Sequence, residues 1–138
     1  MADLVQRIEY YYVEVPNRPG AAAEVFNVLK THGVNLVAFN GFPTSDDRSQ
    51  LILVPSSGKG LVTVAREEGI TLVGPKVALL ISDWEYLGAV ADILNTLGQA
   101  GINVTAMQAI AGGDWRYSAI LWIKPHDVDK AAQILGIP

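Results

Sequence analysis

Asn17–Leu36, NRPGAAAEVFNVLKTHGVNL, has the pattern of an amphipathic helix with an unusual start. Its apolar residues recur at helical spacing, and a Pro-Gly pair stands immediately before the first turn. A second stretch, Glu85–Val104, EYLGAVADILNTLGQAGINV, has the same layout without the proline. The two stretches together indicate that the chain contains two related units.

An internal repeat connects these stretches, because sliding the sequence against itself by 68 residues aligns them without a gap. Eight of the nineteen positions in Gly20–Ala38 are identical to those in Gly88–Ala106. The register holds further on, where LILV at Leu51–Val54 meets AILW at Ala119–Trp122. We therefore expect two repeats that are packed side by side as one unit.

Each repeat has the pattern strand, helix, strand, strand, helix, strand, which predicts an α+β fold of two ferredoxin-like βαββαβ repeats. The sheets are expected to be antiparallel, with the helices on one face. The short strand ITLVG closes the first repeat, and Gly74-Pro75 is expected to turn the chain into the second. The predicted domains are residues 1–75 and 76–138, and the last strand of the second repeat is expected to be short or missing.

The apolar stripe of the first helix is predicted to be Ala22, Val25, Phe26 and Leu29. Val90, Ile93, Leu94 and Leu97 match it in the second repeat. The glycines at 33 and 101 suit a left-handed end to each helix.

The glycine before each helix has two physical interpretations. Free backbone N–H groups at a helix start, together with the helix dipole, form a site for a carboxylate, and a glycine leaves that site open. Pro19 fixes the backbone at the helix start without losing a needed donor. Alternatively, Gly20 and Gly88 only allow the loop to pack tightly against a strand.

Composition excludes several classes of function. The chain has 138 residues, a net charge of -4 and no cysteine, so disulfides and thiolate metal sites are impossible. Without a basic stripe, nucleic acid is not an expected partner. The start of the chain lacks the pattern of a signal peptide, and the apolar runs are too short to span a membrane. We expect a soluble, cytoplasmic protein.

Signals for catalysis, metals or cofactors are weak. His32 and His126 have no acidic or histidine neighbour at ligand spacing, so a surface or helix-end position is favoured for each. SSGKG at Ser56–Gly60 departs from a phosphate loop and is better explained as a helix start capped by a serine. TSDD is explained as a solvated hairpin turn. We expect no catalytic residues, no metal site and no cofactor.

The two quoted stretches resemble the ACT domain family, the small regulatory modules that bind amino acids. The resemblance rests on the order of strand, loop, Pro-Gly, amphipathic helix, Gly, hydrophobic residue and Asn, found twice in fixed register. It implies a ligand where the loop before the first helix of one repeat meets the neighbouring repeat. Asn17 stands where the family usually has an acidic residue, and Leu87 replaces the proline in the second repeat.

The function expected from these observations is a non-catalytic regulatory protein that binds a small molecule, an amino acid, and acts on a protein in trans. The expected ligand-binding residues are Asn17, Arg18, Pro19, Gly20, Ala21, Asn35, Asp83, Glu85, Tyr86, Leu87, Gly88, Ala89 and Asn103. Asn35 and Asn103 have a second interpretation, in which each closes the turn into the next strand. The rival hypotheses are an enzyme or enzyme subunit on a ferredoxin-like scaffold, and a purely structural assembly module.

Self-association is also predicted. Tyr10 and Tyr12 point to one face of the first strand, Tyr11 and Val13 point to the other, and helices cover only one face. A large apolar face without a cover usually marks an interface, and a missing last strand would leave an unprotected edge. We expect a homodimer in which sheet faces or edges meet.

Overall fold

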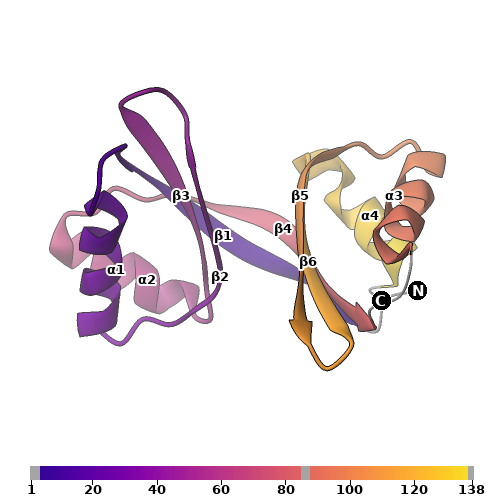
Figure 1. Ribbon diagram of the computed structural model, residues 1–138, viewed down its shortest axis with the longest axis horizontal. Coiled ribbons are helices and arrows are strands. Elements are labelled where there is room, and N and C mark those ends of the chain that lie inside the picture. Colours follow the sequence, from indigo (N-terminus) through magenta and orange to yellow (C-terminus); the bar gives the residue numbers. More distant parts are fainter. Residues whose placement is uncertain (1–3, 85–87, 137–138) are drawn as a thin grey trace. The chain divides into compact units, whose positions relative to one another are not determined.

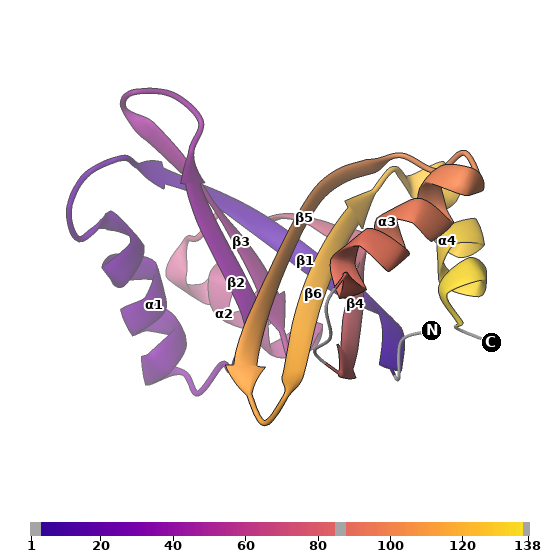
Figure 2. The same cartoon turned by 45° about the vertical axis from the view of Figure 1, so that its right-hand side comes forward.

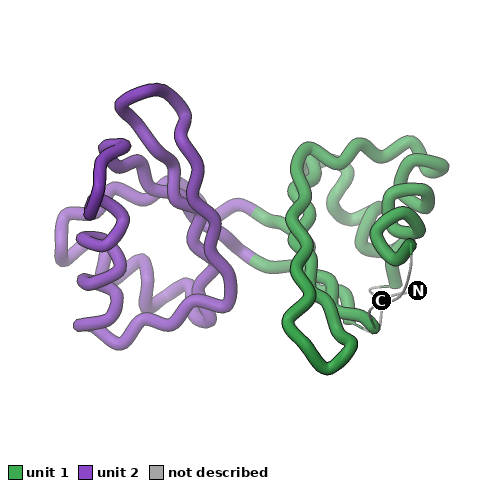
Figure 3. The backbone as a smooth tube through the Cα atoms, in the orientation of Figure 1, with its two compact units in different colours: residues 1–8, 77–138 green, residues 9–76 purple. Residues whose placement is uncertain are grey.

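The computed structural model describes residues 4–84 and 88–136, and the chain divides into two compact units (Figure 3). The first-repeat unit is Glu9–Lys76. The second-repeat unit contains the described residues up to Ile8 and those from Val77 onward. Two long strands, β1 (Leu4–Pro16) and β4 (Val73–Trp84), therefore contribute residues to both units.

The first-repeat unit has the strand order β2-β3-β1-β4, with both helices on one face of the strands (Figure 1). Between β1 and β4 the chain forms α1 (Ala21–Thr31), β2 (Leu36–Pro43), β3 (Arg48–Pro55) and α2 (Gly58–Glu68). The predicted α+β fold with antiparallel pairing and helices on one face is confirmed.

The second-repeat unit has the strand order β1-β4-β6-β5, and its helices again share one face (Figure 2). After β4 come α3 (Ala89–Gln99), β5 (Val104–Gly113), β6 (Arg116–Ile123), a short 3-10 turn η1 (Pro125–Asp127) and α4 (Val128–Leu135). Within the described residues no strand follows α4, as the sequence led us to expect.

The edge of β4 that the missing strand would leave is nevertheless covered. Leu4–Ile8, the first part of β1, belongs to this unit, and β1 is the neighbour of β4 in the sheet. The prediction of an unprotected edge at this place is therefore wrong. The reason is the length of β1, whose thirteen residues supply a strand to each unit.

The expected turn at Gly74-Pro75 is also wrong, because both residues lie inside β4. The last strand of the first repeat and the first strand of the second are parts of one continuous strand, so the chain does not reverse there. A side chain at Gly74 would lie 2.9 Å from the carbonyl oxygen of Tyr10, which requires glycine at this close approach. The first-repeat unit ends at Lys76, one residue beyond the expected domain end at residue 75. The described residues before Glu9 belong to the second-repeat unit.

Strand register repeats with the same 68-residue offset as the sequence. Val13 faces Leu51 across β1 and β3, and Ile81 faces Ala119 across β4 and β6. Each unit has its own hydrophobic core between helices and strands. The residues that anchor these cores are Leu29, Leu53 and Leu61 in the first unit and Leu79, Ile81, Leu97 and Leu121 in the second.

The buried stripe of each helix is rotated from the predicted one. In α3 the buried residues are Ala89, Ile93 and Leu97, whereas Val90 and Leu94 are 37% and 42% exposed. The predicted stripe contained two adjacent lines of apolar residues along the helix. In the structure only the line with Ile93 and Leu97 packs against the strands. The sequence pattern could not choose between lines that are equally apolar.

The first helix of each repeat, α1 and α3, ends as predicted. Gly33 has φ +70 and Gly101 has φ +75, the left-handed conformation. The N–H of Gly33 donates to the carbonyl of Lys30 and the N–H of Val34 to that of Leu29, which satisfies two carbonyls at the helix end. Gly101 and Ile102 make the matching pair of bonds at the end of α3.

The second hairpin turns at Asp114 and Trp115, both of which have positive φ angles of 55 and 58. Such two-residue turns favour Asn-Gly or Asp-Gly, and a left-handed non-glycine residue costs about 1 kcal/mol. The Trp115 side chain is 77% exposed. We expect Trp115→Gly to raise the free energy of unfolding by about 1 kcal/mol, measured by urea denaturation. Trp115→Ala is the control, since an equal gain from alanine would attribute the effect to the ring rather than to the backbone.

Candidate functional site

The start of α1 explains why a glycine precedes the helix. Gly20 is the N-cap residue of α1, with φ +85, and Gly88 holds the same place in α3, with φ +84. A Cβ at either position would meet no atom within 4 Å. The glycines are therefore required by their left-handed backbone and do not serve tight packing of the loop. Valine at either position would strain the backbone whether or not a ligand binds.

The first turn of α1 offers backbone donors near Gly20. The N–H of Ala21 donates to the Arg18 carbonyl at 3.2 Å, so this group is not free for a ligand. Glu24 donates its N–H to the Gly20 carbonyl and begins the helical pattern. Among the described residues, the N–H groups of Gly20, Ala22 and Ala23 have no hydrogen-bond partner. These donors remain for an anion.

Arg18 adds a positive charge beside these donors. Its Nη2 donates to Glu24 Oε1 at 3.2 Å, and the Arg18 side chain is 51% exposed. Glu24 lies in the first turn of α1, where a negative charge is favourable for the helix dipole. The exposed ion pair is weak, so a ligand carboxylate can replace Glu24 at little cost.

Asn17 connects the loop before α1 to the turn between β2 and β3. Its backbone N–H donates to the Asp47 carbonyl at 2.9 Å, and its Nδ2 donates to the Asp46 carbonyl at 3.2 Å. An aspartate at position 17 would lack the second donor and would place a charge beside that carbonyl oxygen. The amide therefore suits this chain. The TSDD segment forms the hairpin turn that we predicted and helps to hold the loop.

A cavity of about 320 Å³ lies beside this loop, entirely within the first-repeat unit. One side is the loop and first turn of α1, and the other is the edge strand β2. Its lining includes Asn17, Arg18, Ala21, Ala22, Phe39, Gly41, Phe42, Pro43 and Ser49. The structure thus brings together Asn17, Arg18 and Ala21 of the predicted residues, with Pro19 and Gly20 between them in the same loop.

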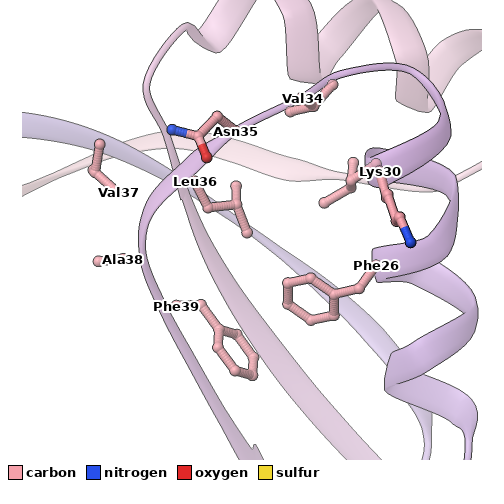
Figure 4. Close-up of a pocket in the computed structure, with 9 residues that line it drawn as sticks. Phe26, Lys30, Val34, Asn35, Leu36, Val37, Ala38 and Phe39 are labelled. Carbon is pink, nitrogen blue, oxygen red and sulfur yellow. The ribbon is translucent and has the colours of Figure 1, made fainter.

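Asn35 lies elsewhere, at a second cavity of about 400 Å³ beside the end of α1 and the start of β2 (Figure 4). Phe26 and Phe39 meet edge to face in this region, with ring centroids 4.7 Å apart. The Asn35 carbonyl accepts bonds from the backbone N–H and the Oγ of Ser56. Since α1 spans about 16 Å, one amino acid cannot contact both Asn17 and Asn35.

The second repeat presents a different set of groups. Gly88 and Ala89 begin α3, and Asn103 follows the opposite end of that helix, so it too is separated from the helix start. Glu85, Tyr86 and Leu87 lie outside the described residues. Asp83 is buried, with 6% of its surface exposed, and its Oδ1 accepts the N–H of Trp84 at 2.7 Å.

Sequence reasoning missed Tyr117. It is buried in β6 directly opposite Asp83, and in the first repeat the matching positions are Ser49 and Val15. The internal alignment places Asp83 at the position of Val15 and Tyr117 at the position of Ser49. Only the observed strand register shows that these two residues face each other.

The remaining candidates have structural roles. His32 caps α1, and its Nε2 lies 2.9 Å from Glu68 Oε1. Ser57 is the N-cap residue of α2 but makes no side-chain bond there, so the predicted serine cap lacks its hydrogen bond. Trp84 is 54% exposed, and the Cζ atom of Arg116 lies 4.7 Å from the centroid of its ring.

Over the described part of the chain, no group of three metal-ligating side chains is found. No helix in that part is long and apolar enough to cross a membrane.

The fold is a βαββαβ module with a cavity beside a helix start. Residues 12–67 match the family model described as the ACT domain. The ACT resemblance inferred from the sequence is thereby confirmed. The second repeat lies outside the matched residues and has the same order of elements from β4 to α4. Among curated proteins, no sequence matches significantly.

Solved structures share this fold over almost the whole chain. Protein BT0572 from Bacteroides thetaiotaomicron matches with a TM-score of 0.83 and 19% identity, covering 95% of this chain and 88% of its own. The ligand-free regulatory subunit of aspartate kinase from Thermus thermophilus matches with a TM-score of 0.66 and 15% identity, covering 97% and 95%. The corresponding subunit from Thermus flavus matches with a TM-score of 0.59 and 18% identity, covering 97% and 95%. At these identities the likeness establishes the fold alone.

Proposed function

We propose that this protein is a non-catalytic regulatory module whose first repeat binds a free amino acid in the cavity between the start of α1 and β2. Two observations carry this proposal: Arg18 and Ala22 line that cavity, and the N–H groups of Gly20 and Ala22 in the same loop and first turn have no partner among the described residues. A guanidinium and a helix start both favour a carboxylate. Phe39 and Phe42 supply apolar surface for a side chain.

The regulatory part of the proposal is supported by the family and by the fold. Segment 12–67 matches the ACT domain family model, and structures with the same fold include regulatory subunits of aspartate kinase. We propose that ligand binding changes how this protein contacts another protein. The edge strand β2 is a suitable surface for such a contact, because its eight residues carry no charge and Val37 and Phe39 are 54% and 49% exposed. A homodimer remains our prediction.

Thermal unfolding in the presence of each of the twenty amino acids tests the proposal. A ligand that binds only the folded state adds about 2.7 kcal/mol of stability at a hundred times its dissociation constant. Arg18→Gln should weaken binding of the responding amino acid about tenfold or more, because one charge-assisted hydrogen bond to its carboxylate is lost.

Arg66→Gln is the matched control, because Arg66 is exposed near the end of α2, outside the lining of the cavity. Equal binding by both variants, measured by calorimetry, would remove Arg18 from the site. A chain that none of the twenty amino acids stabilises would contradict the proposed function.

A further inference from the structure

The last residues of β1 have a strand along one edge only. β4 begins at Val73, and a Cβ on Gly74 would lie 3.3 Å from the Cα atom of Tyr11, so the start of β4 is beside Tyr11. β1 itself continues to Pro16. Over residues 13–16, β1 therefore pairs with β3 on one edge, and the described residues place no strand along the other.

The segment that leads into β4 does not replace the missing strand. Residues 69–72 connect α2 to β4 and are neither helix nor strand. Ile70 donates its N–H to the Ala65 carbonyl at 2.8 Å, which closes the end of α2. Among the described residues, the N–H groups of Thr71 and Leu72 have no partner, and the segment forms no backbone hydrogen bond with β1. The two sides of the gap are therefore not joined.

A cavity of about 580 Å³ lies in this gap, within the first-repeat unit. Val13 and Val15 line it and are buried toward the helices, where Val25 of α1 meets them. Tyr12 and Glu14 alternate with these valines along β1, project to the other face of the sheet and line the same cavity. Because residues of both faces line it, the cavity lies in the plane of the sheet, on the path of a further strand beside β1.

Backbone groups face this cavity from both sides. In an antiparallel pair, alternate residues direct their N–H and C=O groups away from the partner strand, so β1 presents such groups on the edge opposite β3. Residues 69–71 and Val73 line the other side. Backbone groups that are removed from water without a partner cost free energy, so a purely apolar occupant would be unfavourable. An extended chain supplies donors and acceptors at the spacing of a strand.

The side chains around the cavity differ between the two faces of the sheet. On the helix side Val25 and Ile70 extend the aliphatic surface of the buried valines. On the other face Glu14 Oε2 lies 3.6 Å from Arg48 Nη2, so a negative and a positive charge offset each other. An occupant that fits both faces has small apolar side chains on one face and uncharged polar side chains on the other.

We propose that this cavity is a docking site for an extended segment of a partner protein, which adds to the free edge of β1 as a strand. The backbone of the segment pairs with residues 13–16 and accepts the N–H groups of Thr71 and Leu72. Its alternate side chains contact Val25 on one face and the Glu14 carboxylate on the other. The site is distinct from the amino-acid cavity, with which it shares one lining residue, Val15.

Two synthetic peptides test this proposal on the unmodified chain. The probe is acetyl-Thr-Val-Thr-Val-Thr-amide, and its control carries N-methyl groups on both valines, which removes their N–H donors and keeps their side chains. NMR titration of the isotope-labelled chain should show that the probe shifts the amide signals of residues 13–15 and 71–72 and slows their hydrogen exchange. The control should bind at least about tenfold more weakly.

Three results of this titration would overturn the proposal. They are equal affinity for the two peptides, shifts confined to the edge strands β2 or β5, and no binding of the probe. Equal affinity would indicate that the cavity accepts apolar side chains without adding a strand.

A variant that fills the gap locates the site. Thr71 lines the cavity and is exposed, so Thr71→Trp places a large ring in the gap and should weaken binding of the probe about tenfold or more. Thr63→Trp is the matched control, because Thr63 is exposed on α2 outside the cavity lining, and it should leave the affinity unchanged. Melting temperatures without peptide show whether both variants are folded. Full affinity of a folded Thr71→Trp chain would exclude this cavity as the docking site.

Discussion

Removal of residues up to Ile8 should destabilise the second-repeat unit, although its other residues begin only at Val77. Leu4–Ile8 forms the strand that covers the edge of β4, and Val5 packs against the buried cluster of this unit. Arg7 also lies 3.1 Å from Asp129 of α4. Loss of these strand hydrogen bonds and of the Val5 contact should lower the free energy of unfolding by about 3 to 5 kcal/mol.

Tryptophan fluorescence reports on the unfolding of the second-repeat unit. Trp84, Trp115 and Trp122 all lie in the second-repeat unit, and the first-repeat unit contains no tryptophan. Urea denaturation of a chain that begins at Glu9 should therefore show an earlier tryptophan transition than the full chain.

Two point variants separate loss of packing from loss of chain length. Val5→Asp should reproduce much of the destabilisation, because it places a charge against the cluster. Leu4→Asp should have little effect, because Leu4 is 50% exposed. If the truncated chain kept the stability of the full chain, the assignment of Leu4–Ile8 to the second-repeat unit would be wrong.

Leu53→Ala and Leu121→Ala should each lower the free energy of unfolding by about 2 to 5 kcal/mol. The two leucines occupy matching positions in β3 and β6, and both are fully buried. Each change removes buried methyl groups and leaves a cavity in the core of one unit. The loss is a large share of the roughly 5 to 15 kcal/mol that stabilises a domain of ordinary size.

The shared strands lead us to expect that both variants shift a single transition. Since β1 and β4 contribute residues to both units, one unit cannot unfold without disrupting strands of the other. Tryptophan fluorescence and far-UV circular dichroism should therefore give coincident curves for each variant. Leu4→Asp is the surface control. A Leu53→Ala chain whose tryptophan transition is unchanged while part of its helix signal is lost would show independent unfolding.

Much of the candidate site in the first repeat was predictable because it is local. Asn17, Arg18 and Gly20 are close in sequence, and a helix start forces them together wherever the chain folds. Asn35 follows the same helix and lies at a different cavity, because the length of the helix separates its two ends. The contact between Asn17 and the carbonyls of Asp46 and Asp47 joins segments that the sequence pattern does not relate.

By itself the sequence determined the elements, the 68-residue repeat and the glycines that must adopt a left-handed backbone. These depend on periodicity and on local dihedral preferences, which a short segment carries with it. Only the tertiary structure decided that Leu4–Ile8 completes the second-repeat unit, that Gly74 and Pro75 lie within one strand, and that Tyr117 faces Asp83. Each of these results depends on which strands pair. Strand pairing joins residues far apart in the chain, and the competing registers differ only through the side chains that they bury together.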